Sequence, residues 1–296
     1  MEKTLIFGHQ KPDTDAVTSA IVLSYLKNKL GFNTEPRVLG NINNETEFVL
    51  NYFNFDIPKY LNDVRLQIKD VDYINDCFLQ EEDSVFDGYM MMNKTKIGTI
   101  PVIDKNGVFK GVVSMRDVAG ELISNDLGKL DTSYDNLLKA LNGKEVLRFD
   151  KEIMGNIITP SYRSTTFREN IKIDKESVLI VGDRHSIIEY AVMNCASIII
   201  LTNGVEMKKE HLEIAKKNHV DVISTNYDGL MASNMVVLSN FIKTKMKTQD
   251  ISFVNENDSL SDVLEIASKK KYSNYPVVNN DGVCLGIFKA NVAVSK

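Results

Sequence analysis

The feature that most constrains how this chain can fold is an internal repeat. Residues 83–117 align without a gap on residues 258–292, and ten aligned positions are identical, whereas about two identities are expected at average residue frequencies. The identical pairs are Asp83/Asp258, Ser84/Ser259, Asp87/Asp262, Lys94/Lys269, Lys96/Lys271, Pro101/Pro276, Val102/Val277, Gly107/Gly282, Val108/Val283 and Gly111/Gly286. The shared glycines and proline fall at expected turns, where backbone geometry restricts the choice of residue. The sequence therefore contains two copies of one folding unit.

Each copy is expected to form a strand, a helix, a second strand, a tight hairpin and a third strand. Asn106 and Gly107 form the hairpin turn of the first copy, and Asp281 and Gly282 form that of the second. Units of this size rarely bury their apolar face alone. We therefore expect the two copies to pack on each other, although a long segment separates them.

The segments outside the repeats alternate between strand and helix patterns. The first begins with an apolar strand, a helix, a second strand and a second helix, which is typical of a parallel sheet. The sequence therefore predicts an α/β chain in four parts. These are a parallel-sheet domain in residues 1–66, a first α+β repeat in 67–122, an α/β insertion in 123–247 and the second repeat in 248–296.

Candidate metal ligands follow the first predicted strand. His9, Asp13 and Asp15 lie together on the turn between that strand and the first helix. One imidazole and two carboxylates suit a divalent ion such as manganese or magnesium, and ligands bind at the carboxyl ends of strands in open α/β sheets. Asp13 or Asp15 can alternatively serve only as a helix cap. Three ligands do not complete a phosphate-cleaving site, which needs further ligands and cationic groups.

A second candidate site follows the hairpin of the first repeat. Ser114, Arg116 and Asp117 stand at a strand-to-helix turn. The hydroxyl and the guanidinium can hold phosphate, and the carboxylate can accept hydrogen bonds from ribose hydroxyls. The alternative is again a helix cap, made by Ser114 and Asp117.

The second repeat has lost this pattern. Lys289 replaces the serine and Val292 replaces the aspartate, so this copy cannot bind ribose in the same way. Lys289 can still offer a positive charge to a phosphate. Tyr272 and Tyr275 flank the proline of the second copy and can stack on an adenine, or they can pack in the core.

The composition argues against several other classes of function. The net charge of −5 and the pI near 5.5 argue against binding to nucleic acid. No apolar run approaches the ~20 residues that span a bilayer, and no secretory signal opens the chain. Cys77, Cys195 and Cys284 lack metal-ligand spacing and are expected to be reduced thiols. We therefore expect a cytoplasmic protein without a membrane anchor.

The motifs resemble known families. The opening GHQKPDTDAVTSAI is similar to the first motif of the DHH phosphoesterases, and GNINNETEFVLNYFNFDIPKYL resembles the manganese-dependent, family II inorganic pyrophosphatases. The repeat resembles a pair of CBS domains, and VGDRHSIIEY with IIILTNGV resembles the DRTGG domain. The order of modules, which is a DHH start, a CBS domain, DRTGG and a second CBS domain, is that of the CBS-domain pyrophosphatases.

This resemblance implies a function and its ligands. It implies hydrolysis of pyrophosphate to two phosphates with Mn²⁺, or with Mg²⁺ or Co²⁺, bound by His9, Asp13 and Asp15. It also implies inhibition by AMP and ADP and activation by ATP or diadenosine polyphosphates. CBS pairs commonly dimerise through apolar helix faces, and residues 90–92 offer such a face, so a homodimer is expected.

The chain also departs from the family pattern. Lys11 replaces the usual asparagine of the first motif. In the family, further metal ligands and the pyrophosphate-binding cations follow the second CBS domain, so this 296-residue chain is expected to be inactive alone. Two alternatives stay open: a non-catalytic sensor of adenine nucleotides, and another DHH enzyme such as a nuclease or a nucleotidyltransferase.

Overall fold

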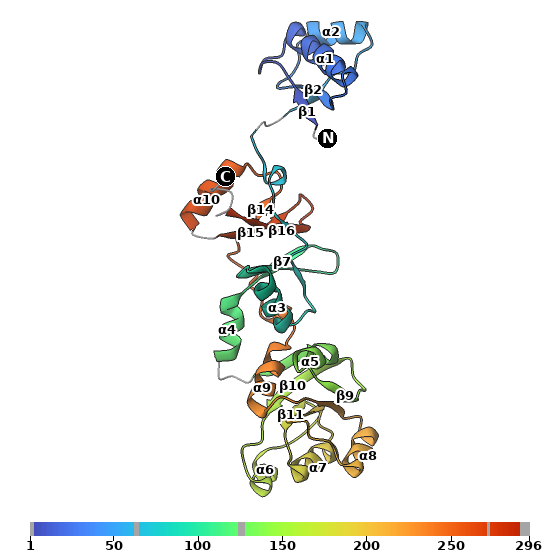
Figure 1. Cartoon of the computed structure of the whole chain (residues 1–296), viewed down its shortest axis with the longest axis vertical. Helices are drawn as coiled ribbons and strands as arrows, with labels where there is room; N and C mark the ends of the chain where they lie inside the picture. The colour runs from blue at the N-terminus through green and yellow to red at the C-terminus, as the bar shows by residue number, and fades with distance from the viewer. Residues whose placement is uncertain (1–2, 62–64, 124–127, 271–272, 291–296) are drawn as a thin grey trace. The chain divides into compact units, whose positions relative to one another are not determined.

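The computed structural model describes residues 3–61, 65–123, 128–270 and 273–290. The chain divides into two compact units, residues 1–66 and residues 67–296. The expected α/β architecture is confirmed, with parallel strands in the first unit and in the insertion of the second (Figure 1). No helix of the described residues has the length and apolar character that crossing a membrane requires.

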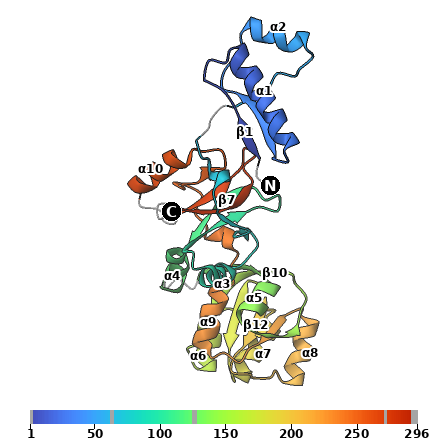
Figure 2. The same cartoon turned by 45° about the horizontal axis from the view of Figure 1, so that its top comes forward.

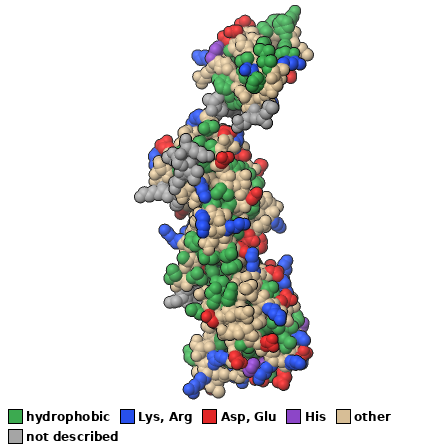
Figure 3. All heavy atoms as spheres, in the orientation of Figure 1, with side chains coloured by type: hydrophobic (Ala, Val, Ile, Leu, Met, Phe, Trp, Pro, Cys, Tyr) green, Lys and Arg blue, Asp and Glu red, His purple; other side chains and the backbone are tan. Residues whose placement is uncertain are grey.

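The first unit is a small parallel sheet with two helices. Its elements are β1 (Thr4–Ile6), α1 (Thr14–Lys29), β2 (Thr34–Val38), α2 (Asn44–Tyr52) and β3 (Lys59–Tyr60), with sheet order β1-β2-β3. Its buried apolar cluster consists of Val17, Val38 and Leu50. Large apolar side chains of α1 and α2 are instead exposed, and Figure 3 shows hydrophobic surface on this unit. They include Val22, Tyr25, Leu26, Leu30, Phe48 and Tyr52.

The second unit begins and ends with the two repeats. The first repeat and the segment before it contain η1 (Ile68–Asp70), β4 (Ile74–Asn75), β5 (Leu79–Gln80), α3 (Val85–Thr95), β6 (Thr99–Ile103), β7 (Phe109–Ser114) and α4 (Met115–Ile123). The second contains η2 (Ile242–Thr244), β14 (Val254–Asn255), α10 (Leu260–Lys270), β15 (Asn274–Val278) and β16 (Cys284–Lys289). Their hairpins β6–β7 and β15–β16 are antiparallel and shift register at equivalent positions, as expected of two copies of one unit.

Each repeat exchanges an arm with the other. The arm before the first repeat, residues 67–75, packs on the second repeat: Ile68 N–H donates to Asp258 O at 3.0 Å, and β4 pairs with β16. The arm before the second repeat, residues 240–247, packs on the first: Ile242 N–H donates to Asp83 O at 2.7 Å. Asp83 and Asp258 are equivalent positions of the repeat, so the two exchanges are related by the same internal symmetry.

The exchange of arms explains one pair of shared glycines, Gly111 and Gly286. A Cβ at Gly111 would overlap the backbone oxygen of Lys247, and a Cβ at Gly286 would overlap that of Ile74. The two glycines therefore share one role, since each leaves room for the backbone of the arm that belongs to the other repeat. The other shared glycines, Gly107 and Gly282, have φ values of 80° and 78° at their hairpin turns, as the sequence predicts.

The insertion between the repeats is a six-stranded α/β sheet. It contains β8 (Lys129–Ser133), α5 (Tyr134–Ala140), β9 (Lys144–Leu147), β10 (Glu152–Ile158), α6 (Ser164–Asn170), β11 (Ser177–Val181), α7 (His185–Met193), β12 (Ile198–Leu201), α8 (Lys209–Lys217), β13 (Asp221–Ser224) and α9 (Gly229–Leu238). The sheet order is β8-β10-β11-β12-β13-β9, in which the four central strands are parallel.

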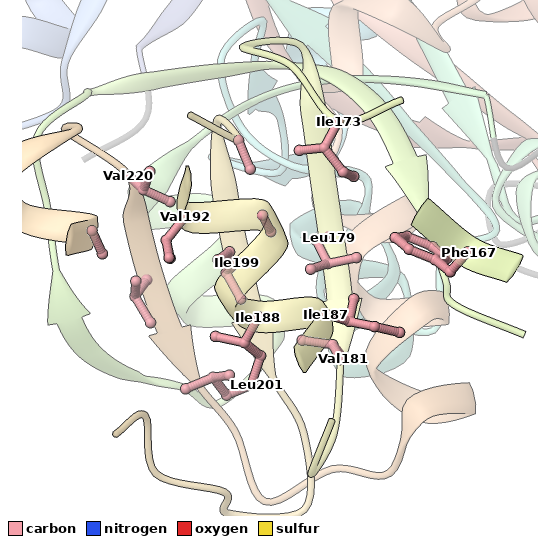
Figure 4. Packing of buried hydrophobic residues seen from close by; sticks show 14 residues of the cluster. Phe167, Ile173, Leu179, Val181, Ile187, Ile188, Val192, Ile199, Leu201 and Val220 are labelled. Atoms are coloured by element: carbon pink, nitrogen blue, oxygen red, sulfur yellow. The ribbon is translucent and has the colours of Figure 1, made fainter. Parts of the chain in front are cut away.

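Alternate residues of the buried strands form two apolar layers, one on each face of this sheet. Leu179 and Ile199 pack against α6, α7 and α8 on one face (Figure 4). Val178 and Ile198 pack against α5 and α9 on the other. Figure 2 shows this arrangement of helices around the sheet. Because the side chains of a strand alternate between faces, a central strand with helices on both sides is apolar along its whole length.

One buried carboxyl group makes the stability of the insertion depend on pH. Asp221 is 0% exposed and accepts backbone hydrogen bonds from Phe149 at 2.6 Å and from Asp150 at 3.4 Å. Burial raises the pKa of Asp221 from 3.8 to about 6, although the two hydrogen bonds oppose the shift. The unfolded chain therefore loses this proton at a lower pH than the folded chain does. Its contribution to stability is present below pH 3.8 and is lost as the pH rises through about 6.

We expect Asp221→Asn to remove this pH dependence. The wild-type chain should lose about 3 kcal/mol of unfolding free energy from this carboxyl between roughly pH 4 and pH 6.5, and the variant should not. Urea denaturation of both chains at the two pH values measures the difference. An equal loss in both chains would contradict the assignment to Asp221.

Candidate nucleotide site

A cavity of about 390 Å³ lies where the first repeat, the arm of the second repeat and strand β15 meet. Thr99 and Ser114 are cross-strand partners at the open end of the β6–β7 hairpin, and both line the cavity. The first turn of α4 contributes Arg116 and Asp117. The predicted site residues Ser114, Arg116 and Asp117 therefore lie together on one wall.

Asp117 is the electrostatic centre of this wall. Its Oδ2 accepts hydrogen bonds from the backbone N–H of Ser114 at 2.8 Å and from the Ser114 hydroxyl at 2.6 Å. Its Oδ1 forms an ion pair with Lys247 Nζ at 2.9 Å. Burial raises the pKa of Asp117, but the hydrogen bonds from Ser114 and Lys247 outweigh it and hold the pKa below its usual value. The carboxyl group is therefore ionised and available as a charged acceptor.

Lys247 is a cationic residue of the cavity that was not predicted from the sequence. It is held in place by its own backbone, because Lys247 N–H donates to Val112 O at 2.8 Å and Lys247 O accepts from Val112 N–H at 3.0 Å. Lys245, two residues earlier, pairs with Glu121 at 2.8 Å, one turn further along α4. The alternating lysines of residues 243–247 are the signal that could have identified this cationic edge.

The two predicted site residues of the second repeat lie elsewhere. Tyr275 is 1% exposed and belongs to the apolar core of its own repeat, so its ring has no face open to the cavity. Its neighbours Asn274 and Pro276 line the cavity instead. Lys289 ends β16, outside the cavity lining. Tyr272 and Val292 lie outside the described residues.

The predicted metal ligands His9, Asp13 and Asp15 lie on the turn before α1 and in its first turn. His9 Nε2 lies 3.4 Å from Asp13 Oδ1, and both side chains are exposed. Asp13 also caps α1, because its Oδ1 accepts the backbone N–H of Ala16 at 2.9 Å. Asp15 lies in the first turn of α1 and contacts Ser19. Among the described residues, no three His, Cys, Asp or Glu side chains are grouped closely enough to hold a metal ion.

Comparisons with known proteins identify the modules. The DRTGG domain model matches residues 136–239, and the CBS domain model matches residues 68–124 and 242–290. The crystal structure of the CBS and DRTGG domains of the regulatory region of Clostridium perfringens pyrophosphatase, complexed with the activator diadenosine tetraphosphate, is 26% identical. It superposes with a TM-score of 0.66 over 76% of this chain and 100% of that one.

Longer relatives match nearly the whole sequence. The cobalt-dependent inorganic pyrophosphatase of Clostridium perfringens is 30% identical over 288 residues, which are 95% of this chain and 52% of that protein. The probable manganese-dependent inorganic pyrophosphatase of Thermotoga maritima is 26% identical over 97% of this chain and 53% of its own length. The chain thus spans about half the length of these relatives. It carries a pair of CBS domains interrupted by a DRTGG domain and is a relative of the CBS-containing, family II inorganic pyrophosphatases.

Proposed function

We propose that this chain is the adenine-nucleotide-sensing part of a metal-dependent inorganic pyrophosphatase. The observation that carries the proposal is the cavity wall on which Asp117, Ser114, Arg116 and Lys247 converge. A charged acceptor beside two cations matches a ribonucleotide, which presents two ribose hydroxyls next to its phosphates. The relative from Clostridium perfringens, whose regulatory region binds diadenosine tetraphosphate, supports the same ligand class.

In this proposal the nucleotide replaces one ion pair with several contacts. The ribose hydroxyls donate to Asp117, while the phosphate takes Lys247, Arg116 and the Ser114 hydroxyl. Asp117 and Lys247 form an ion pair at 2.9 Å, and the nucleotide would exchange this pairing for contacts of its own with both side chains. The adenine lies toward Asn274 and Pro276 of the second repeat, which also line the cavity.

We expect Asp117→Asn to weaken AMP binding by about 10- to 100-fold, because hydrogen bonds to a charged group contribute about 1.5–3 kcal/mol. Calorimetry on the wild-type chain should show one AMP per chain with micromolar affinity. The wild type should prefer AMP over 2′-deoxy-AMP, and the variant should lose that preference. Loss of the hydrogen bonds from Ser114 to Asp117 at the start of α4 would weaken the binding of both nucleotides equally. The comparison of AMP with 2′-deoxy-AMP therefore isolates the ribose contact.

One further variant serves as a control, and a second tests the phosphate contact. Glu121→Gln removes the ion pair one turn away on α4, outside the cavity, and should leave AMP affinity unchanged. Lys247→Met should weaken AMP and ADP but leave adenosine binding unaltered, because it removes a phosphate contact. Equal AMP affinity in the wild type and Asp117→Asn would place the nucleotide elsewhere.

For the catalytic part, we propose that His9, Asp13 and Asp15 contribute ligands to a manganese or cobalt centre. The convergence of His9 and Asp13 supports this assignment, and the metal dependence named for the relatives supports the choice of ion. A metal bound there would lower the pKa of a coordinated water and polarise pyrophosphate. The second candidate function is a sensor of adenine nucleotides without catalysis, which the cavity around Asp117 would serve equally well.

We also expect the chain to form a homodimer in solution. Met90 on α3 is exposed, although Met92, predicted to lie on the same contact face, is buried. Sedimentation equilibrium at two concentrations should give twice the 33.3 kDa mass of one chain. A monomer at tens of micromolar protein would contradict this expectation.

A further inference from the structure

The geometry points to a second ligand site, in the DRTGG domain, that binds a small phosphate-bearing anion. The inference is independent of the nucleotide site proposed above. It rests on a cavity of about 660 Å³ at the carboxyl edge of the parallel sheet, lined by the ends of β10, β11 and β12 and by the first turns of α9. This volume is within the range of sites for small metabolites.

The cavity lies at the carboxyl ends of strands β10, β11 and β12, between Gly182 and the start of α9. After β11 and β12 the chain turns to α7 and α8, which pack on one face, whereas α9 packs on the other face, beside the cavity. Ligands of open α/β sheets bind outside the carboxyl ends of the strands, so the cavity lies where such a ligand is expected.

The lining residues favour an anion. Among the described residues that line the cavity, Arg184 is charged and the others are neutral. Its guanidinium is held in place by the backbone oxygens of Pro160, at 2.7 Å, and Tyr162. Arginine has five N–H donors, so donors remain for an oxyanion after these contacts.

Neutral donors surround the same space. Thr202 lines the cavity and is only 2% exposed. Asn203, which follows β12, and Asn234 of α9 line it as well. Several neutral donors beside one cation suit the acceptor oxygens of a phosphate group. Gly182 lets Thr202 lie close to it, because a Cβ there would be only 3.3 Å from Thr202 Oγ1.

The N-terminus of α9 is not required to bind the anion. Asp228 caps that helix, accepting the backbone N–H of Met231 at 2.8 Å, so its carboxylate already occupies the first turn. The side chains of Arg184, Thr202, Asn203 and Asn234 therefore carry the recognition.

The test is a titration of the isotope-labelled 296-residue chain with inorganic phosphate at constant ionic strength. We expect saturable shifts of the backbone amide signals of Gly182, Asn203 and Asn234, with a Kd of about 1 mM. Glycerol 3-phosphate should bind at least as tightly if the occupant is a phosphorylated metabolite, and less tightly if it is free phosphate. Acetate should not compete.

Two isosteric variants make the test specific. Asn203→Asp keeps a residue type that tolerates the positive φ of 57° at this position and adds a negative charge to the cavity wall. It should weaken phosphate binding by about tenfold or more. Asn226→Asp adds the same charge in a separate cavity beside β13 and should leave phosphate binding unchanged. Equal effects of the two variants, no saturable shift with phosphate, or equal binding of acetate would each overturn the inference.

Discussion

The 296-residue chain is expected to release no measurable phosphate from pyrophosphate, with manganese or with cobalt. Hydrolysis of a phosphoanhydride at a two-metal site requires several ligands for each ion and cationic groups on the phosphates. The described residues supply the His9–Asp13 pair at 3.4 Å and no third ligand close to it. We therefore expect phosphate release at the background level, because two paired side chains are too few to bind two metal ions.

The measurement is phosphate release at micromolar protein with each metal in turn. A full-length relative assayed in parallel confirms that the conditions support turnover. Any phosphate release should be equal in the wild-type chain and in Asp15→Ala, which would mark it as contamination. Turnover that Asp15→Ala abolishes would show that these residues form a working centre.

The second prediction with a large expected effect concerns the folding stability of residues 1–66 as a separate peptide. The buried apolar cluster of this unit consists of Val17, Val38 and Leu50, with Ile21 and Ile42 partly buried against it. Tyr52 of α2 is 73% exposed. Domains of this size bury a small share of their surface and are marginal even with a complete core, so we expect a peptide of residues 1–66 to be unfolded at room temperature.

Residues 67–296, by contrast, should fold alone, because their apolar clusters are large and continuous. Circular dichroism and amide chemical-shift dispersion of the two fragments provide the comparison. The control is Tyr52→Ser in the whole chain, which should leave the main unfolding transition unchanged. A cooperative thermal transition in the isolated peptide of residues 1–66 would contradict this expectation.

The repeat could be predicted from sequence because its shared residues have local roles. Asp83 and Asp258 each accept a backbone hydrogen bond from the residue three positions earlier, at 2.8 Å in both copies. Gly107 and Gly282 each adopt the positive φ of their turn. Such roles depend on a few neighbouring residues, so they leave identities that an alignment detects.

The exchanged arms could not be predicted in this way. They are joined to the opposite repeat by backbone hydrogen bonds between distant segments, and backbone atoms leave no side-chain signature. Lys247 was missed for this reason, since only the arm brings it to the cavity. The prediction that Tyr275 lines the site was wrong for a different reason. The side chains of β15 alternate between its two faces, and the sequence does not reveal which face meets the core. Asn274 and Pro276 face the cavity while Tyr275 faces the core.

The place where the insertion enters and leaves the CBS pair has a consequence for how the chain folds. Phe241 N–H donates to Asp131 O at 2.9 Å, and Asp131 N–H donates to the side-chain oxygen of Asn240 at 2.7 Å. The two ends of the insertion are therefore fastened to each other, because the segment after α9 is bonded to the first strand of the insertion, β8.

Once the DRTGG domain has folded, the two repeats are connected as if by a very short loop. The loop-closure entropy that their pairing would otherwise cost across so long a segment has then already been lost in folding the insertion. We therefore infer an order of folding in which the insertion forms first and the two repeats then exchange their arms. The same fastening explains how a whole domain can be accommodated within a fold whose halves must meet.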